Sequence, residues 1–321
     1  MRRREFLSLL GGAAAAWPRA AQAQDWPNRP IRFVVPLAAG GGLDFVARVV
    51  GEHMSRELRQ QVFIENRTGA GSTIGIDTAI KSAPDGYSVL VTNDNVASAP
   101  HVMRLNVDFL QSLMPVCVLG RQPQALAVHP SIGAINSVAD LVALAKQRPG
   151  MSCATSGVGS NQHVLLEWLA KQAGIKFEHV PYRGAGQAIN DLIAGHVQIG
   201  ILGPSALIPH YKTGSLRLLA QSSEKRSKSL PEVPTLAESG FPELTVESWY
   251  AAFVPLGTPA SVIARLNAAA NKAVADSATR DQFLTSATEP VGGTPEDLTK
   301  VARGDFEKYA RLIGELNIRT N

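Results

Sequence analysis

Three consecutive glycines, Gly40–Gly42, stand in the run Pro36–Asp44, between an apolar segment and a segment with helical spacing of apolar residues. Glycine leaves the backbone bare, and the N–H groups at a helix N-terminus carry the positive end of its dipole. Such a turn can hold a carboxylate or a phosphate. We predict that the ligand-binding residues of this turn are Ala38, Ala39, Gly40, Gly41 and Gly42. Tight packing of the glycines is the alternative.

The turn lacks the Gly-Lys-Ser/Thr ending of a nucleotide-binding loop and the glycine spacing of a dinucleotide-binding fold. Phosphate transfer is therefore not expected. No His/Cys cluster has the spacing of metal ligands, so we expect no metal and no cofactor. The basic residues form no stripe, which argues against nucleic acid as a partner.

A second turn of the same kind, Thr155–His163, follows another apolar segment. Small residues expose its backbone, and we predict that Ser156, Gly157, Gly159 and Ser160 contact a polar ligand together with His163. In a purely structural role, Ser160 would cap the following helix. A catalytic alternative pairs Ser160 with His163 as nucleophile and base in a hydrolase. No acidic residue is placed to orient the histidine and no Gly-x-Ser-x-Gly elbow is present, so we expect no enzyme.

Two further residues follow predicted strands. Asn93 comes after the strand at 88–91, where a plain Asx turn is an equal alternative. Gly203 comes after the strand at 197–202. Ligands of α/β sheets bind beyond the carboxyl ends of the strands, so we include both in the predicted binding site.

The elements around these turns alternate between strand and helix. Strands at 31–35, 62–64 and 88–91 alternate with helices at 43–58 and 72–83, which predicts an α/β fold with parallel sheets covered by helices. A second series follows, with strands at 152–155, 177–180, 197–202 and 216–220 and helices at 138–146, 160–173 and 185–194. An apolar segment at 246–254 returns toward the first series, and helices are predicted at 259–274 and 296–316. We therefore predict two lobes with the ligand cleft between them: 24–123 with 249–321, and 124–248.

The N-terminus reads as a cleavable export signal. Arg2–Arg4 precede an apolar run at Leu7–Ala16, which is too short to span a membrane, and Ala21–Ala23 supply the small-x-small cleavage pattern. We predict cleavage after Ala23 and export to the periplasm. The paired arginines favour the twin-arginine route over the ordinary secretory route. Most of the net charge of +4 lies in this signal.

The chain has two cysteines, Cys117 and Cys153, both in apolar surroundings. The periplasm would permit a disulfide. Separate buried thiols are the favoured interpretation, because sequence alone cannot bring the two sulfurs together.

In order and spacing, many short motifs resemble the Bug-type substrate-binding proteins of tripartite tricarboxylate transporters. The resemblance runs through nearly all of the chain after the signal. The matching residues include Trp26–Arg32, Val35–Pro36 with the glycine turn and Asp44, Ala47–Arg48, Glu65–Arg67, Gly69–Gly71, Pro84–Tyr87, Ser156–Ser160 with His163, His179–Tyr182, Asp191–Leu192 with Gly195, Val233–Thr235 with Glu238 and Gly240, Ser248–Trp249 and Gly257–Pro259.

This resemblance implies a two-lobed, flytrap-like periplasmic-binding-protein fold of type II. It implies that the turns at 38–42 and 156–160 hold a carboxylate of the ligand with backbone amides, small hydroxyls and bridging waters. The expected function is capture of a small organic carboxylate, a di- or tricarboxylate or an aromatic acid, by a monomer that delivers it to a membrane permease. Delivery to a sensor kinase is the alternative. The sequence departs from the family pattern at Leu37, Thr68 and Ala251, so the pocket shape beside Leu37 is left open.

Overall fold

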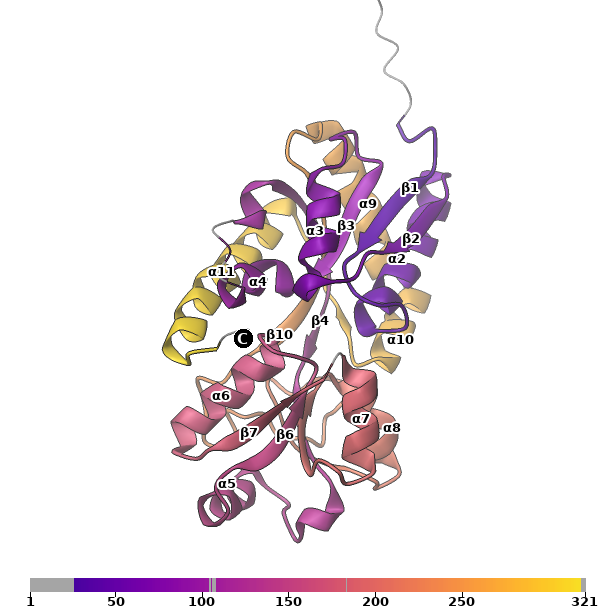
Figure 1. The fold of residues 1–321 in the computed structure, drawn as a ribbon. Coiled ribbons are helices and arrows are strands. Elements are labelled where there is room, and N and C mark those ends of the chain that lie inside the picture. Colours follow the sequence, from indigo (N-terminus) through magenta and orange to yellow (C-terminus); the bar gives the residue numbers. More distant parts are fainter. Residues whose placement is uncertain (1–25, 104, 106–107, 183, 319–321) are drawn as a thin grey trace, which may run out of the picture.

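The computed structural model describes residues 26–103, 105, 108–182 and 184–318, so the predicted signal and its cleavage site lie outside the described residues. These residues form two β-sheets of six and five strands, each covered by helices. We call the part built on the six-stranded sheet the first lobe and the other part the second lobe. Figure 1 shows the first lobe above the second, with long strands running between them.

The first lobe contains a sheet in the order β11-β4-β10-β3-β1-β2. Its strands are β1 (Ile31–Val35), β2 (Val62–Asn66), β3 (Ser88–Asn93), β4 (Leu113–Pro123), β10 (Glu247–Pro255) and β11 (Glu289–Pro290). Strand β1 runs parallel to β2 and β3, whereas β10 runs antiparallel to both β3 and β4. The carboxyl ends of β1 and β3 therefore lie at the same edge of this sheet.

Helices cover both faces of the first sheet. They are α2 (Gly42–Leu58), α3 (Thr73–Ile80), α4 (Asn95–Val102), α9 (Ala260–Ala275), α10 (Ser277–Thr285) and α11 (Pro295–Glu315), with short 3-10 helices η2 (Ala70–Ser72) and η3 (Phe109–Gln111). One core forms under α2 and α9 around Phe33, and the other forms under α4 and α11 around Tyr309. Alternate residues of β1 feed opposite faces, since Phe33 and Val35 join the first core while Val34 joins the second.

The second lobe contains a sheet in the order β7-β6-β8-β5-β9. Its strands are β5 (Ala125–Val128), β6 (Met151–Thr155), β7 (Phe177–Pro181), β8 (Ile199–Leu202) and β9 (Arg217–Gln221). Its helices are α5 (Val138–Gln147), α6 (Asn161–Ala173), α7 (Ala185–Ile193), α8 (Pro204–Lys212) and the 3-10 helix η4 (Pro130–Ile132). Strand β6 is parallel to β7 and β8, whereas β5 is antiparallel to β8 and β9. Two further cores lie on the faces of this sheet.

The chain passes between the lobes twice. Gln124 alone separates β4 of the first sheet from β5 of the second, and the return runs from β9 through residues 222–246 into β10. The two crossings are bonded to each other, because the Gln124 N–H donates to Ser222 Oγ at 2.8 Å and the Ser222 N–H donates to the Gln124 carbonyl at 2.9 Å. We call these two crossings the hinge.

The prediction of parallel sheets is wrong in part, because both sheets are mixed. Strand β10 runs opposite to β3 and begins where the chain returns to the first lobe, and β5 runs opposite to β8 and begins where the chain enters the second lobe. The direction of these two strands is therefore set by the crossings rather than by a strand–helix–strand unit. The predicted helix at 72–83 is also too long. It begins at Thr73 and ends at Ile80, since Ala70 and Ser72 have positive φ and form η2 with Gly71.

Cys117 and Cys153 are free, buried thiols that lie in different sheets. Burial raises the pKa of Cys117 to about 12 and raises the pKa of Cys153 further, which makes both thiols unreactive. Within the described ranges, no helix is long and apolar enough to cross a membrane. The same residues contain no cluster of three metal-ligating side chains.

Candidate functional site

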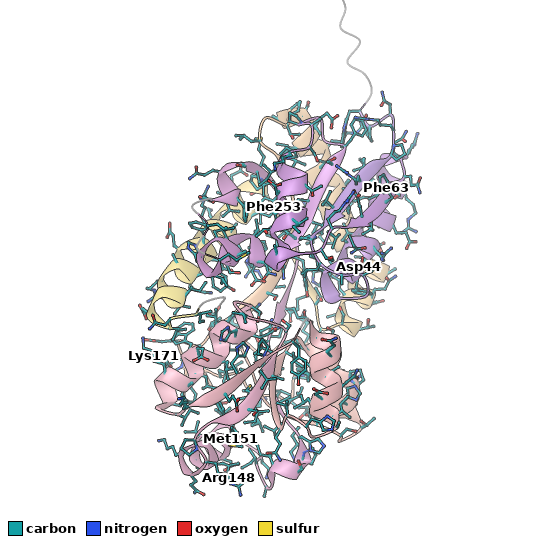
Figure 2. All side chains as sticks on the ribbon, viewed as in Figure 1. Asp44, Phe63, Arg148, Met151, Lys171 and Phe253 are labelled. Atoms are coloured by element: carbon teal, nitrogen blue, oxygen red, sulfur yellow. The ribbon has the colours of Figure 1, made fainter. Side chains whose placement is uncertain are left out.

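The first glycine turn joins β1 to α2 at the edge of the sheet that faces the second lobe. In Figure 2, Asp44 lies on this side of the first lobe, whereas Met151 and Arg148 lie toward the far end of the second lobe. Residues Ala38–Gly41 are exposed, and Gly42 is half-buried. Gly40 has a φ of +83°, which explains a glycine at that position. The structure therefore places the predicted turn at the surface, with its backbone accessible.

The carboxylate of Asp44 fixes the shape of this turn. Its Oδ2 accepts the Gly40 N–H at 2.9 Å and its Oδ1 accepts the Asn66 side-chain amide at 3.0 Å, while Asn66 also donates to the Leu37 carbonyl. Arg48 forms a bidentate pair with the same carboxylate. Burial opposes ionisation of Asp44, but the bonds from Arg48, Gly40 and Asn66 outweigh burial and lower its pKa. Asp44 is thus an ionised side chain that holds the turn and uses the Gly40 amide.

The first turn of α2 leaves several amides free. The earliest intrahelical bond runs from the Phe45 N–H to the Gly41 carbonyl, and Gly41 offers no side chain as a cap. The N–H groups of Gly42, Leu43 and Asp44 consequently have no partner among the described residues. These free donors, at the positive end of a 17-residue helix, are suited to a carboxylate oxygen.

In the second turn, between β6 and α6, most hydrogen-bond donors already bond to acceptors of the same turn or of α6. Ser160 caps α6 by accepting the His163 N–H at 3.2 Å, and its hydroxyl donates to the Gly157 carbonyl at 2.8 Å. The N–H and the hydroxyl of Ser156 both donate to Gln162 Oε1. Gly159 is buried, and a Cβ there would lie 2.3 Å from Val102 of α4 in the first lobe. The turn is therefore preorganised and packed against the opposite lobe.

His163 supports this turn from within. Its Nδ1 accepts the Gly159 N–H at 3.1 Å, so the proton of the neutral ring is on Nε2. The ring is 7% exposed and stacks on His179 at a centroid distance of 3.7 Å. Burial and the neighbouring His163 lower the pKa of His179 to about 4, so His179 is neutral near pH 7.

This arrangement disfavours the hydrolase alternative. A nucleophile donates its proton to the ring nitrogen of its base. Here the Ser160 hydroxyl donates to the Gly157 carbonyl, and the Nδ1 of His163 is occupied by the Gly159 amide. The two side chains act together in holding a turn.

Asn93 and Gly203 lie near the other predicted residues, at the hinge. Asn93 pairs with Tyr250 of β10, and the Tyr250 hydroxyl donates to Gln122 Oε1 at 2.7 Å. A Cβ on Gly42 would lie 2.9 Å from that hydroxyl, and a Cβ on Gly203 would lie 3.4 Å from Gln122 Oε1. Residues from both lobes therefore converge on Gln122.

Sequence reasoning missed Gln122 and Tyr250. Gln122 follows Arg121 near the end of a mainly apolar strand, and Tyr250 lies within another. A buried glutamine in an apolar strand needs a polar partner, which is the signal that the sequence offered. The partner itself is 128 residues away and could not be identified from spacing.

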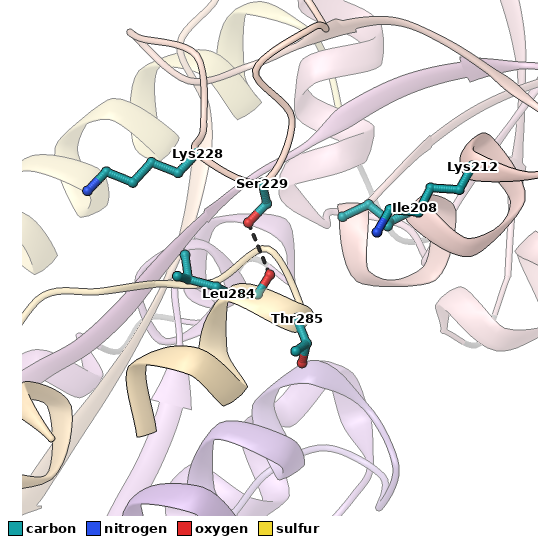
Figure 3. Close-up of a pocket in the computed structure, with 6 residues that line it drawn as sticks. All are labelled: Ile208, Lys212, Lys228, Ser229, Leu284 and Thr285. Carbon is teal, nitrogen blue, oxygen red and sulfur yellow. Dashed lines mark hydrogen bonds between the residues drawn. The ribbon is translucent and has the colours of Figure 1, made fainter. Parts of the chain in front are cut away.

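A separate pocket of about 260 Å³ lies elsewhere between the lobes (Figure 3). It is lined by Ile208, Lys212, Lys228, Ser229, Leu284 and Thr285. The Ser229 hydroxyl donates to the Leu284 carbonyl at 3.1 Å and thereby ties the segment after β9 to α10. Figure 3 shows Lys228 extending away from Lys212, so the two cations do not converge on one point. The predicted site residues do not line this pocket.

Comparisons with known proteins give a consistent result. Residues 46–318 match the family described as the tripartite tricarboxylate transporter family receptor. Protein BugT of Bordetella pertussis is 34% identical over 317 residues, which cover 97% of this chain and 94% of BugT. The structure of R. palustris Rpa4515 with adipate is 29% identical with a TM-score of 0.85, over 92% of this chain and 100% of that chain. MatC of Rhodopseudomonas palustris with bound malate is 25% identical with a TM-score of 0.81, over 90% of this chain and 100% of that chain. The chain therefore belongs to the tripartite tricarboxylate transporter receptor family.

Proposed function

We propose that this protein is a solute receptor that binds a small organic carboxylate between its two lobes and delivers it to a membrane permease of the tripartite tricarboxylate type. This proposal rests on the exposed turn at Ala38–Gly42. The free amides at the start of α2 lie at the positive end of the helix dipole, close to Gln122, on which residues of both lobes converge. Adipate and malate, the ligands named in the two related structures, are both dicarboxylates.

In the proposed site, the free amides of the first turn hold one carboxylate. Ser156, Gly157 and Ser160 of the second turn lie nearest to the ligand, with their own donors bonded within that turn. Asn93 contributes its side-chain amide, because its Oδ1 already accepts the Asn95 N–H and its Nδ2 has no partner among the described residues. Gly203 lets the ligand approach the backbone before α8. Gly159 and His163 support the second turn.

The proposed function is binding and transfer, without a chemical reaction. A ligand that touches both lobes favours the closed arrangement by its differential affinity for that arrangement. A micromolar Kd requires about −8 kcal/mol. One carboxylate with several N–H donors, together with apolar contacts, can supply this amount.

The remaining proposals concern export, the lobe boundaries and the oligomeric state. Export, by the twin-arginine route with cleavage after Ala23, is proposed from the sequence. The lobe boundaries at 123/124 and 248/249 are supported by the change of sheet between β4 and β5 and by the return of the chain into β10. We propose that the mature receptor is a monomer.

A thermal-shift screen of mono-, di- and tricarboxylates and aromatic acids tests the function. We expect at least one carboxylic acid to raise the melting temperature, while its analogue with every carboxyl group converted to an amide does not. Failure of every acid to stabilise the protein would refute the proposed function.

The variant Gly41→Val then tests the turn. Gly41 has a φ of −84°, and a Cβ there meets only the Ala38 carbonyl at 3.6 Å, so the variant should fold normally. The added side chain blocks access to the amides, and loss of charge-assisted bonds should weaken binding by about tenfold or more. Gly304→Val on α11, where a Cβ meets nothing within 4 Å, is the matched control. Unchanged affinity in Gly41→Val would show that the turn only packs.

A further inference from the structure

A row of buried polar side chains connects the second turn to the hinge. Gln162 is 8% exposed, Gln124 is 1% exposed and Ser248 is 7% exposed. Gln162 lies on α6, Gln124 lies between β4 and β5, and Ser248 lies on β10. The row therefore starts in the second lobe and reaches both segments that cross between the lobes.

Along this row each hydrogen bond is donated in the same direction, from Ser156 toward Ser248. Gln162 Oε1 accepts both donors of Ser156, and Gln162 Nε2 donates to Gln124 Oε1 at 2.8 Å. Gln124 Nε2 in turn donates to Ser248 Oγ at 3.2 Å. Asn161 Nδ2 donates to the same oxygen at 2.6 Å. Rotating either glutamine amide would place a donor against a donor, so the orientation of Ser156 and the orientation of the hinge amides are linked.

The far end of the row reaches the first lobe. Ser248 lies close enough to Asp94 to favour the charged form of that carboxyl, although Asp94 Oδ1 makes no hydrogen bond of normal geometry among the described residues. Asp94 directly follows Asn93 at the end of β3, and its Oδ2 accepts the Tyr309 hydroxyl at 2.9 Å. The row thus leads from one predicted binding segment to the other through the hinge.

We propose that Gln162 and Gln124 are positioning residues that couple the donors of Ser156 to the closure of the two lobes. This inference rests on the proposed function, since closure around a carboxylate is the event that the coupling serves. Gln124 lies between the two sheets and Ser248 lies on β10 of the first sheet, so their hydrogen bond joins the two segments about which the lobes would rotate. A buried amide that loses its hydrogen-bond partner destabilises the folded state. A reorientation of Ser156 therefore favours a matching reorientation of Gln124 at the hinge, and the reverse also holds.

The first test needs no ligand. Hydrogen–deuterium exchange is measured in the mature chain for wild type, Gln162→Met and Gln124→Met. We expect Gln124→Met to accelerate exchange of the Ser156 amide about fivefold or more, although residue 124 does not touch Ser156. Reciprocally, Gln162→Met should accelerate exchange of the Gln124 amide, which donates to Ser222 Oγ. Gln198→Met is the matched control, because the side chain of Gln198 bonds only to Ser131 among the described residues and takes no part in the row. The proposal would be overturned if exchange changed only at the residues that contact the replaced side chain. If Gln124→Met does not fold, Ser248→Ala serves as the hinge variant.

The second test measures closure with adipate and malate as probes. Spin labels on the two lobes report the interlobe distance in wild type and Gln162→Met. We expect Gln162→Met to bind a probe about five- to tenfold more weakly and also to show a smaller closed fraction at saturation. Weaker binding with full closure at saturation would indicate a merely structural role and refute the coupling. If neither probe binds the wild type, the exchange experiment alone decides the coupling, whereas the broader thermal-shift screen decides the proposed function.

Discussion

Replacing Asp94 by asparagine should change how the stability of the protein depends on pH. Asp94 is fully buried beside Ser248 and Tyr250 of β10 and beside Tyr309 and Asp305 of α11. Burial and the charge of Asp305 raise its pKa from 3.8 to about 7, outweighing the hydrogen bond from Tyr309. Asp305 is itself held by the Trp249 indole N–H at 2.7 Å and by Lys308 at 3.1 Å.

The sign of the effect follows from proton uptake. Between pH 4 and pH 7 the folded protein keeps the Asp94 proton, whereas the unfolded chain has lost it. The free energy of unfolding therefore falls as pH rises through this window. The shift is about three pKa units, which corresponds to about 4 kcal/mol as an upper bound. Between pH 5 and pH 8 the wild type should lose about 3 kcal/mol through this group.

Urea denaturation at pH 5 and pH 8 measures the difference. Asp94→Asn cannot ionise, so we expect its stability to fall less than that of the wild type between these values, by about 3 kcal/mol. Asp281→Asn, at an exposed position on α10, is the control and should follow the wild type. Parallel pH profiles for wild type and Asp94→Asn would refute the assignment of a neutral, buried acid at this position.

Three further substitutions test the two turns. Asp44→Ala removes the acceptor for the Gly40 amide, so urea denaturation should show a loss of about 1–3 kcal/mol, and the wild type should lose the same support as pH falls through the lowered pKa of Asp44; an unchanged midpoint would contradict this. Gly159→Ala places a methyl group against Val102 at a φ of +75°, and denaturation should show a loss of at least 1 kcal/mol that Val102→Ala partly restores; an additive double variant would argue against the contact. Ser160→Ala removes the cap of α6 and should cost about 1 kcal/mol in the same assay, whereas loss of a measurable esterase activity would instead support the hydrolase.

Local signals predicted the first turn well. The strand at Ile31–Val35 and the helix beginning at Gly42 follow from adjacent residues, because apolar periodicity and a glycine run act over short distances. The capping role of Ser160 was likewise available from its place before an apolar helix. The family resemblance and the two-lobed fold are confirmed by the comparisons.

Features that depend on contacts between distant residues could not be predicted from the sequence. The direction of β4 and β10 depends on partners more than 100 residues apart, as in the pairing of Ala252 with Cys117. Helix α4 was missed because it contains Pro100 and lies against α11, where Tyr309 bonds to Asp94. The internal use of the Ser156 donors by Gln162 also depends on how α6 folds back on its own turn.

In the proposed site, the free amides at the start of α2 bind the carboxylate of the ligand. The most direct measurement follows the ¹⁵N–¹H signals of glycine-labelled protein while the stabilising acid from the screen is added. We predict that the signals of Gly41 and Gly42 shift in proportion to saturation, and that the signal of Gly304 on α11 does not. Saturable binding that leaves the Gly41 and Gly42 signals unchanged would show that the ligand binds elsewhere.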